Sequence, residues 1–149
     1  MVTIRLSPDF KEFLKLLNEN NVRYLLIDGY AVAFHGYPRT TGDMDIWIAI
    51  DPANAKNVTK SLQDFGFNVA SLNENLFVDT NNIIRMGNPP YRIEIITSVS
   101  GIEFEDCYPA RITKNIDGTD IHFISKRDLI INKKAAGRNK DLDDIENLG

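Results

Sequence analysis

The chain has 149 residues, of which 43% are hydrophobic and 26% are charged, enough for one well-covered core and too few for two. Lys and Arg number 17 against 21 Asp and Glu, a formal net charge of −4, so no overall basic field is available to hold a long nucleic-acid backbone. We therefore expect a single domain over residues 1–149 that acts on a small or locally held substrate.

The sequence predicts neither a membrane-bound nor a secreted protein. No apolar run approaches the roughly 20 residues that cross a bilayer, and the opening MVTIRLSPDFKEF lacks the apolar stretch of a secretory signal. Cys107 has no partner for an internal disulfide and is expected to be a small buried hydrophobe. His35 and His122 lack zinc-ligand spacing. We expect a cytoplasmic protein without membrane contact.

Helices and strands alternate in the first half of the chain. Ser7 is a good N-cap, followed by proline and aspartate at the first helical positions, and Asp51 precedes a second such start. Between them, apolar runs bounded by asparagine and glycine indicate buried strands. The expected elements are a helix from 8 to about 18–21, a strand over 22–28, a short helix over 30–34, a strand over 43–50 and a helix from 52 to about 65.

The second half is mostly β-rich. The GNPP segment over 87–90 is a tight turn, so the strands on either side should pair as a hairpin. Ser125 with Asp128 gives a start resembling a capping box. The expected elements are strands over 67–71, 75–79, 82–87, 91–99 and 120–125, a helix over 126–136 and a short helix over 138–148. Together they predict an α/β (α+β) domain with a small mixed β-sheet flanked by helices.

Two carboxylates, Asp43 and Asp45, open the apolar strand segment that continues as IWI. Residues two apart in a strand project from the same face, about 6–7 Å apart along the chain. Such carboxylates repel each other. Leaving them unpaired near a core costs roughly several kcal/mol, as the burial of a charge typically does. A divalent cation offsets it, and Mg²⁺ prefers carboxylate oxygens together with substrate phosphates. Glu94, between apolar residues in YRIEIIT, is the best third ligand, from a neighbouring strand.

These residues carry a family resemblance. A strand ending in glycine, a short helix and a loop leading to Asp-x-Asp, with a later acid among hydrophobes, resembles the nucleotidyltransferase superfamily that includes DNA polymerase beta. More closely, GYAVAFHGYPRTTGDMDIWI together with DLIINKKAAGRNKDLDDIENL looks like the small bacterial nucleotidyltransferases of the AbiEii type and the antibiotic nucleotidyltransferases. The resemblance spans roughly residues 24–148 and implies the nucleotidyltransferase fold.

The same resemblance implies a reaction and its residues. A nucleoside monophosphate passes from a nucleoside triphosphate, such as ATP, to an acceptor, pyrophosphate leaves, and Mg²⁺ is required, as two ions for which Mn²⁺ can substitute. Asp43 and Asp45 are expected to bind both ions, and Glu94 to complete the acceptor-side ion and help deprotonate the attacking hydroxyl. The expected nucleotide-binding residues are Gly29, Tyr30, Arg39, Thr40, Lys133 and Arg138.

Two positions depart from the family pattern. The turn usually has glycine followed by glycine or serine, whereas here Tyr30 follows Gly29, and its ring either crowds the phosphates or swings outward. The third acid is commonly aspartate, whereas Glu94 is one methylene longer, which metal chemistry tolerates but which also fits a relaxed or lost activity. Both departures concern catalysis rather than fold.

Several candidates have a structural reading beside the functional one. Arg39 contacts the triphosphate, orients Asp43 or forms a plain salt bridge, and Thr40 with Thr41 at least caps the turn. Lys133 and Arg138, five residues apart near one face of the helix over 126–136 and its end, reach phosphates or form a solvated basic face.

Two further acids and Asp28 are also open. Asp141 and Asp144 are expected to hold Lys or Arg side chains rather than metal. Asp28, at the end of the first strand, lines the cleft or stabilises the turn.

The sequence thus predicts a Mg²⁺-dependent nucleotidyltransferase in a toxin–antitoxin or resistance setting, with an unidentified acceptor. An antibiotic hydroxyl, a tRNA 3′ end and a protein side chain all present an oxygen nucleophile, and nothing in the chain separates them. The competing hypothesis is a catalytically weak or inactive member that acts as an antitoxin or binds a partner protein. Because the chain is small, a partner or a homodimer would supply the acceptor surface.

Overall fold

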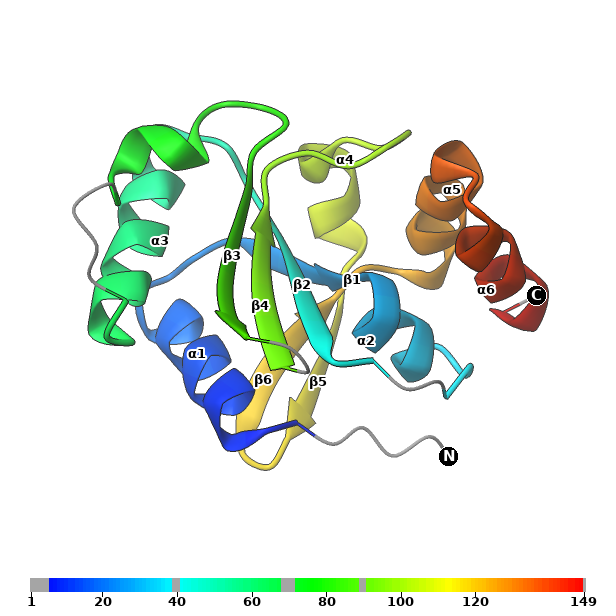
Figure 1. The fold of residues 1–149 in the computed structure, drawn as a ribbon, viewed down its shortest axis with the longest axis horizontal. Coiled ribbons are helices and arrows are strands. Elements are labelled where there is room, and N and C mark those ends of the chain that lie inside the picture. Colours follow the sequence, from blue (N-terminus) through cyan, green and yellow to red (C-terminus); the bar gives the residue numbers. More distant parts are fainter. Residues whose placement is uncertain (1–5, 39–40, 68–71, 89–90, 149) are drawn as a thin grey trace.

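The computed structural model describes residues 6–38, 41–67, 72–88 and 91–148. In these ranges the chain forms a six-stranded sheet with helices around it (Figure 1). The helices are α1 (Pro8–Glu19), α2 (Asp28–Phe34), α3 (Pro52–Asp64), α4 (Phe104–Cys107), α5 (Lys126–Ala136) and α6 (Asn139–Leu148), with 3-10 turns η1 (Glu74–Phe77) and η2 (Tyr108–Ala110). The strands are β1 (Tyr24–Ile27), β2 (Asp43–Ile48), β3 (Ile83–Asn88), β4 (Tyr91–Ile96), β5 (Ile112–Ile116) and β6 (Thr119–Phe123).

The sheet is mixed, with the strand order β3-β4-β2-β1-β6-β5. Three pairs are antiparallel, β1 with β2, β3 with β4 and β5 with β6, while β2 with β4 and β1 with β6 are parallel. The expected hairpin between the strands that flank residues 87–90 is confirmed. Because β2 and β4 run the same way through the middle of the sheet, polar residues near their starts face the same region.

One face of the sheet is covered by α1 and α3, which pack against each other (Figure 1). The predicted start of α1 is confirmed, since the Ser7 hydroxyl accepts a hydrogen bond from the Phe10 amide at 3.2 Å. The apolar stripe of α1, which includes Phe13 and Leu17, is completely buried. This packing fixes the sheet and leaves the acidic ends of β2 and β4 on its other side.

One sequence expectation for the middle of the chain comes out differently, and another falls mostly outside the described residues. The predicted strand over 75–79 is wrong: the chain forms η1, started by the Asn73 side chain, which accepts from the Asn75 amide at 2.9 Å. An asparagine cap competes with strand pairing, and the turn inserts Phe77 into the core, where it is fully buried. The predicted strand over 67–71 lies outside the described residues except for Phe67.

The sequence did not indicate β5 or α4. Four of the five β5 residues are exposed at the edge of the sheet, so they show no apolar periodicity. The helix α4 is only four residues long, which is too short to show a helical repeat. Along the described part of the chain, no helix is long and apolar enough to cross a membrane.

The expected C-terminal helices are confirmed as α5 and α6, which pack on each other beside α2 (Figure 1). The Ser125 hydroxyl caps α5 by accepting from the Asp128 amide at 3.2 Å. Gly137 ends α5 in the left-handed conformation, with φ of 66°, which glycine adopts at little cost. The resulting sharp turn brings α6 back against α5.

Candidate active site

The three predicted acids lie on one face of the two central strands. Asp45 of β2 stands directly opposite Glu94 of β4 in the parallel register, and Asp43 stands opposite Arg92. Side chains alternate between faces along a strand, so all three carboxylates project from the side of the sheet away from α1 and α3. This register agrees with the expectation that the three acids come from two adjacent strands, although their oxygens do not all converge on one point.

Asp45 is the most buried of the three, with 8% of its surface exposed. Burial, followed by a hydrogen bond with the Glu94 carboxyl and the nearby charge of Asp28, raises the pKa of Asp45 to about 8. A carboxyl group with this pKa holds a proton at neutral pH unless a cation replaces it. Asp45 therefore avoids a second negative charge beside Glu94 by keeping its proton, and a bound metal ion could take the place of that proton.

Two arginines meet the other two acids. Arg92 contacts Asp43 through two bonds, Nε to Oδ1 at 3.3 Å and Nη2 to Oδ2 at 3.2 Å. Arg85, on the neighbouring strand β3, stands opposite Glu94 and donates from Nε to Oε1 at 3.0 Å. The sequence analysis did not single out either arginine, because each pairing depends on cross-strand register.

The acids open into a cleft of about 560 Å³. Its walls come from the ends of β1 and β2, from β3 and β4, from the loop that follows β4, and from α5 and α6. The polar side chains that line it are Asp28, Asp43, Asp45, Arg85, Glu94, Ser98, Ser100, Asn132, Arg138 and Lys140. Three acids on the segment after β4, Glu103, Glu105 and Asp106, do not line this cleft; Glu105 instead pairs with Arg23.

Gly29 lies at a close approach between α2 and the loop before β2. A Cβ atom on Gly29 would lie 2.6 Å from the Thr41 hydroxyl oxygen, too close for any real contact. The same hydroxyl donates to the Asp43 carbonyl at 3.2 Å, so Thr41 caps the turn as one reading expected. The missing side chain of Gly29 thus lets this loop reach the start of β2, and its contact with a nucleotide stays a prediction.

Tyr30 points into the core. It is 7% exposed, and its ring meets Phe10 edge-on with centroids 5.9 Å apart. Burial, followed by the neighbouring Tyr91 and Asp43, raises the pKa of the phenol. The side chain neither lines the cleft nor crowds it, so only its backbone is left as a nucleotide contact. The predicted contacts of Arg39 and Thr40 lie outside the described residues.

Lys133 is the centre of a buried ion cluster. Its Nζ lies 2.9 Å from Asp28, 3.2 Å from Asp141 and 2.9 Å from Asp144. Burial opposes its charge, but Asp28 and Asp144 outweigh burial, and the pKa of Lys133 is raised. The expectation that Asp141 and Asp144 hold basic side chains is confirmed.

Lys133 itself is 1% exposed, so the solvated basic face is the wrong reading for it. Its three carboxylate partners tie α5 and α6 to the start of α2 at the edge of the cleft. Arg138 remains 58% exposed while its Nε bonds Asp141 at 2.7 Å. Phosphate contacts by Lys133 and Arg138 stay predictions.

Asp28 combines both roles that the sequence left open. It lines the cleft and accepts from Lys133, and Lys140 Nζ lies 3.4 Å from its second oxygen. Its backbone has φ of 54°, in the left-handed region that few non-glycine residues adopt. The ion pairs hold this residue at the junction between β1 and α2.

The donor set at Asp43, Asp45 and Glu94 fits a hard divalent cation, because it consists of carboxylate oxygens around a buried, proton-holding Asp45. In the described part of the chain, the set of three acidic groups whose oxygens already all lie within 4.8 Å of one another is Asp28, Asp141 and Asp144. That cluster holds the Lys133 ammonium instead. The three predicted ligands would have to close up around an ion.

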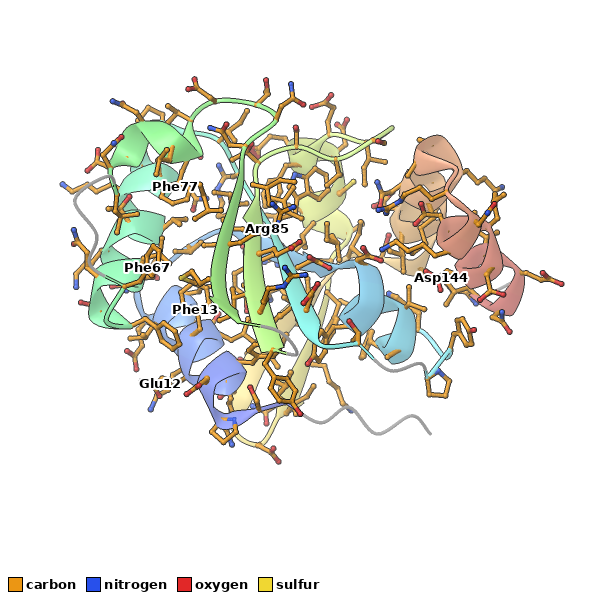
Figure 2. All side chains as sticks on the ribbon, viewed as in Figure 1. Glu12, Phe13, Phe67, Phe77, Arg85 and Asp144 are labelled. Carbon is orange, nitrogen blue, oxygen red and sulfur yellow. The ribbon has the colours of Figure 1, made fainter. Side chains whose placement is uncertain are left out.

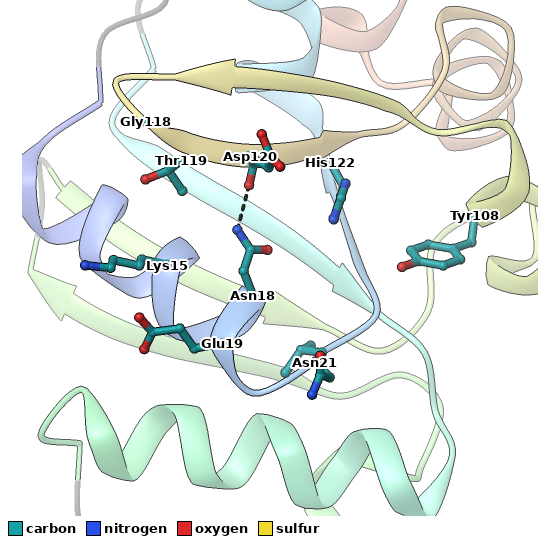
Figure 3. Close-up of a pocket in the computed structure, with 10 residues that line it drawn as sticks. Lys15, Asn18, Glu19, Asn21, Tyr108, Gly118, Thr119, Asp120 and His122 are labelled. Atoms are coloured by element: carbon teal, nitrogen blue, oxygen red, sulfur yellow. Dashed lines mark hydrogen bonds between the residues drawn. The ribbon is translucent and has the colours of Figure 1, made fainter.

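A second hollow, of about 630 Å³, lies between α1, η2 and the β5–β6 hairpin (Figure 3). Figure 3 shows the Asn18 amide donating to the Asp120 carbonyl, a bond of 2.7 Å. Tyr108 and His122 stand on the other side of the hollow. None of the predicted site residues lines it, so it is distinct from the acidic cleft.

The whole described chain can be compared with known proteins. Residues 5–149 match the family described as a nucleotidyltransferase of unknown function (DUF6036). The chain belongs to this nucleotidyltransferase family. Among curated proteins, no relative matches.

Solved structures of nucleotidyltransferase-like proteins share the fold. An antigenic nucleotidyltransferase-like protein from Paracoccidioides brasiliensis is 22% identical with a TM-score of 0.54, over 96% of this chain and 77% of its own. A candidate nucleotidyltransferase from Thermotoga maritima is 12% identical with a TM-score of 0.63, over 92% of this chain and 88% of its own. The superfamily and the fold expected from the sequence are therefore confirmed; the narrower AbiEii resemblance stays a prediction.

Proposed function

We propose that this member of the nucleotidyltransferase family transfers a nucleoside monophosphate from a nucleoside triphosphate to a hydroxyl acceptor in the acidic cleft. The observation that carries the proposal is the register of β2 and β4, which sets Asp45 opposite Glu94 and Asp43 two residues before, all beside an open cleft. Carboxylates placed in this way could supply ligands for Mg²⁺ beside substrate phosphates.

The proposed reaction is a substitution at the α-phosphorus. The acceptor oxygen forms a bond to that phosphorus, the bond to the bridging oxygen breaks, and pyrophosphate leaves with the electron pair. Two bound Mg²⁺ or Mn²⁺ ions would supply charge neutralisation on both oxygens. Asp43 and Asp45 would bind both ions, and Glu94 would complete the acceptor-side ion and help to take the hydroxyl proton. Most of the catalysis is then positioning and charge neutralisation.

The competing proposal is a weak or inactive member that binds a partner protein, for instance as an antitoxin. The ion pairs Arg85–Glu94 and Arg92–Asp43 favour it, because a protein that never binds metal would keep them permanently. The AbiEii resemblance supports a toxin–antitoxin or resistance setting, with an antibiotic, a tRNA or a protein as the acceptor. This alternative predicts a partner complex that is indifferent to loss of the acids.

We test the proposal by comparing Glu94→Gln with Asp43→Asn. An amide cannot take the proton and binds Mg²⁺ more weakly than a carboxylate does. Glu94→Gln should therefore keep nucleoside triphosphate affinity within about a few-fold, because the triphosphate-side ion keeps its ligands, yet lose transfer. Asp43→Asn should lose both. Equilibrium nucleotide binding and transfer of labelled nucleotide into lysate fractions measure the two properties.

The matched control is Asp79→Asn, an exposed acid outside the cleft, which should behave as the parent in both assays. If Glu94→Gln transfers nucleotide as fast as the parent, Glu94 is not the third carboxylate. If neither the parent nor any variant transfers a nucleotide while a partner complex forms equally with all of them, the binding-module alternative replaces the enzyme.

A further inference from the structure

Arg85 lies on β3, the edge strand of the sheet (Figure 2). Its side chain is 57% exposed, whereas the side chain of its partner Glu94 is 14% exposed. No described strand lies beyond β3 on this side, so nothing in the sheet confines the outer part of the arginine. Arg85 is therefore a charged group with freedom to leave a more buried carboxylate.

Arg92 makes an equivalent pair on the next row of the same face. Its guanidinium bonds both oxygens of Asp43, and the two side chains are 34% and 35% exposed. Two of the three acids thus carry a guanidinium, which is a permanent cation.

A guanidinium and a metal ion compete for the same lone pairs. The ion must bind on the face where the arginine bonds the carboxylate. The carboxylate therefore cannot offer its oxygens to the ion without breaking the ion pair, and the guanidinium and the metal ion repel each other. The oxygens of Asp43, Asp45 and Glu94 also do not converge within 4.8 Å in this state. Loading this site with metal therefore requires the arginines to move.

We propose that Arg85 is a phosphate-binding residue that exchanges partners: it holds Glu94 in the empty site, and it binds substrate phosphate when metal takes the carboxylate. The inference rests on the proposed function and assigns a phosphate contact to a residue outside the predicted nucleotide-binding set. Arg92 is left out of this assignment, because it does not line the cleft that its partner Asp43 lines.

Charge and geometry support the exchange. An arginine freed from a carboxylate carries a planar fork of N–H donors that matches phosphate as well as carboxylate. Arg85 lines the same cleft of about 560 Å³ that the acids line, so phosphate groups of a substrate would enter beside it. Metal alone should then bind weakly, because the displaced arginine loses its carboxylate partner. Metal together with a phosphate ligand should bind strongly, because the phosphate becomes the new partner of the arginine.

The experiment compares Arg85→Gln with Lys140→Gln. Both residues line the cleft and both substitutions remove one positive charge, but Lys140 pairs with Asp28 rather than with a predicted ligand. Affinity for Mn²⁺ alone is measured by equilibrium titration, followed by affinity for a non-hydrolysable ATP analogue at saturating Mn²⁺. AMP or adenosine, which differ by one phosphate, is then added to that complex in the place of the acceptor, and its affinity is measured. This step separates a contact with the phosphates of the nucleotide from a contact with a phosphate on the acceptor.

Arg85→Gln should change the two affinities in opposite directions. Mn²⁺ should bind about two- to fivefold more tightly, because no half-exposed ion pair has to be broken. The phosphate-bearing ligand should bind about tenfold more weakly, because a charge-assisted hydrogen bond is lost. A loss confined to the ATP analogue assigns Arg85 to the nucleotide, and a loss of the preference for AMP over adenosine assigns it to the acceptor.

Lys140→Gln should leave the affinity for Mn²⁺ within about twofold of the parent's, because it changes only the general electrostatic field of the cleft. Equal gains in Lys140→Gln and Arg85→Gln would overturn the exchange in favour of a field effect. Unchanged phosphate binding in Arg85→Gln would also overturn it, leaving a structural ion pair. If the parent binds no Mn²⁺ with or without nucleotide, the proposed function fails. If the parent binds Mn²⁺ and nucleotide and Arg85→Gln binds both with the same affinities, this inference alone is overturned.

Discussion

Asp45 is a buried carboxyl group beside other acids, and its pKa is strongly raised. Its pKa of about 8 in the folded protein stands against an ordinary value of 3.8, with burial as the largest cause. The folded protein therefore binds one more proton at Asp45 than the unfolded chain over this pH interval. Its stability must fall as pH rises through the interval, because the folded protein has to give up that proton.

The matching prediction concerns Asp45→Asn without metal. The amide resembles the protonated acid, so the variant should lose the pH dependence that Asp45 causes, and its free energy of unfolding should exceed that of the parent most clearly at pH 8.5. The parent's decline is at most about 1.4 kcal/mol per pH unit. Urea unfolding in EDTA at pH 5, 7 and 8.5 measures it. The prediction is contradicted if the difference in unfolding free energy between the parent and Asp45→Asn stays constant over this pH range.

At the scale of elements, the ion cluster around Lys133 joins α5 and α6 to α2. Lys133→Met keeps a long side chain but leaves Asp28, Asp141 and Asp144 without their shared ammonium. Removing one partner of a buried ion pair costs about 3–5 kcal/mol, and we expect a loss of unfolding free energy of this order. Lys134→Met, at an exposed neighbouring position, should change it by less than about 0.5 kcal/mol.

The measurement is urea unfolding of both variants at pH 7. A loss in Lys133→Met no larger than in Lys134→Met would mean that the cluster does not hold the helices. If Lys133→Met does not accumulate as folded protein, the double variant Lys133→Met with Asp141→Asn gives the answer, because removing one carboxylate should recover part of the loss.

The elements that sequence could predict are those with strong local signals. The helix over 126–136 has a serine cap, an acid at the third position and a terminal glycine, and α5 begins and ends at those residues. The strand from Asp43 is an apolar run long enough to stand out, although it ends at Ile48 rather than Ile50. By contrast, η1 depends on an asparagine cap that competes with an apolar strand signal, and β5 has no buried face.

The site divides in the same way. Asp43, Asp45 and Glu94 could be chosen from sequence because charges inside apolar strands need a reason. Arg85 and Arg92 could not, since their roles arise only once β3, β4 and β2 are in register. The burial of Tyr30 and Lys133 also depends on tertiary packing, through Phe10 and through the carboxylates of α6.

At the scale of the whole molecule, ligand binding should appear as thermal stabilisation. A ligand that binds only the folded protein at about 100 times its Kd adds about 2.7 kcal/mol, which for a chain of this size raises the Tm by about 5–10 °C. We expect Mg²⁺ or Mn²⁺ together with a nucleoside triphosphate to produce such a shift in the parent. Asp45→Asn should abolish it, since the buried ligand is gone.

Differential scanning fluorimetry with metal, nucleotide and both together checks this. Asp79→Asn, whose side chain lies outside the cleft, should keep the full shift. A shift of equal size without metal, or in Asp45→Asn, would place nucleotide binding away from the three acids.

The Lys133–Asp28 pair joins residues 105 positions apart, and this separation has a consequence for biosynthesis. At about 5–20 residues per second, the ribosome makes Asp28 about 5–20 s before Lys133. During that interval the strained turn at Asp28 lacks the ammonium that holds it, and the helices that form one wall of the cleft do not yet exist. A nascent chain therefore exposes its acids without a finished cleft, and the proposed transfer would have to wait until translation has passed α6.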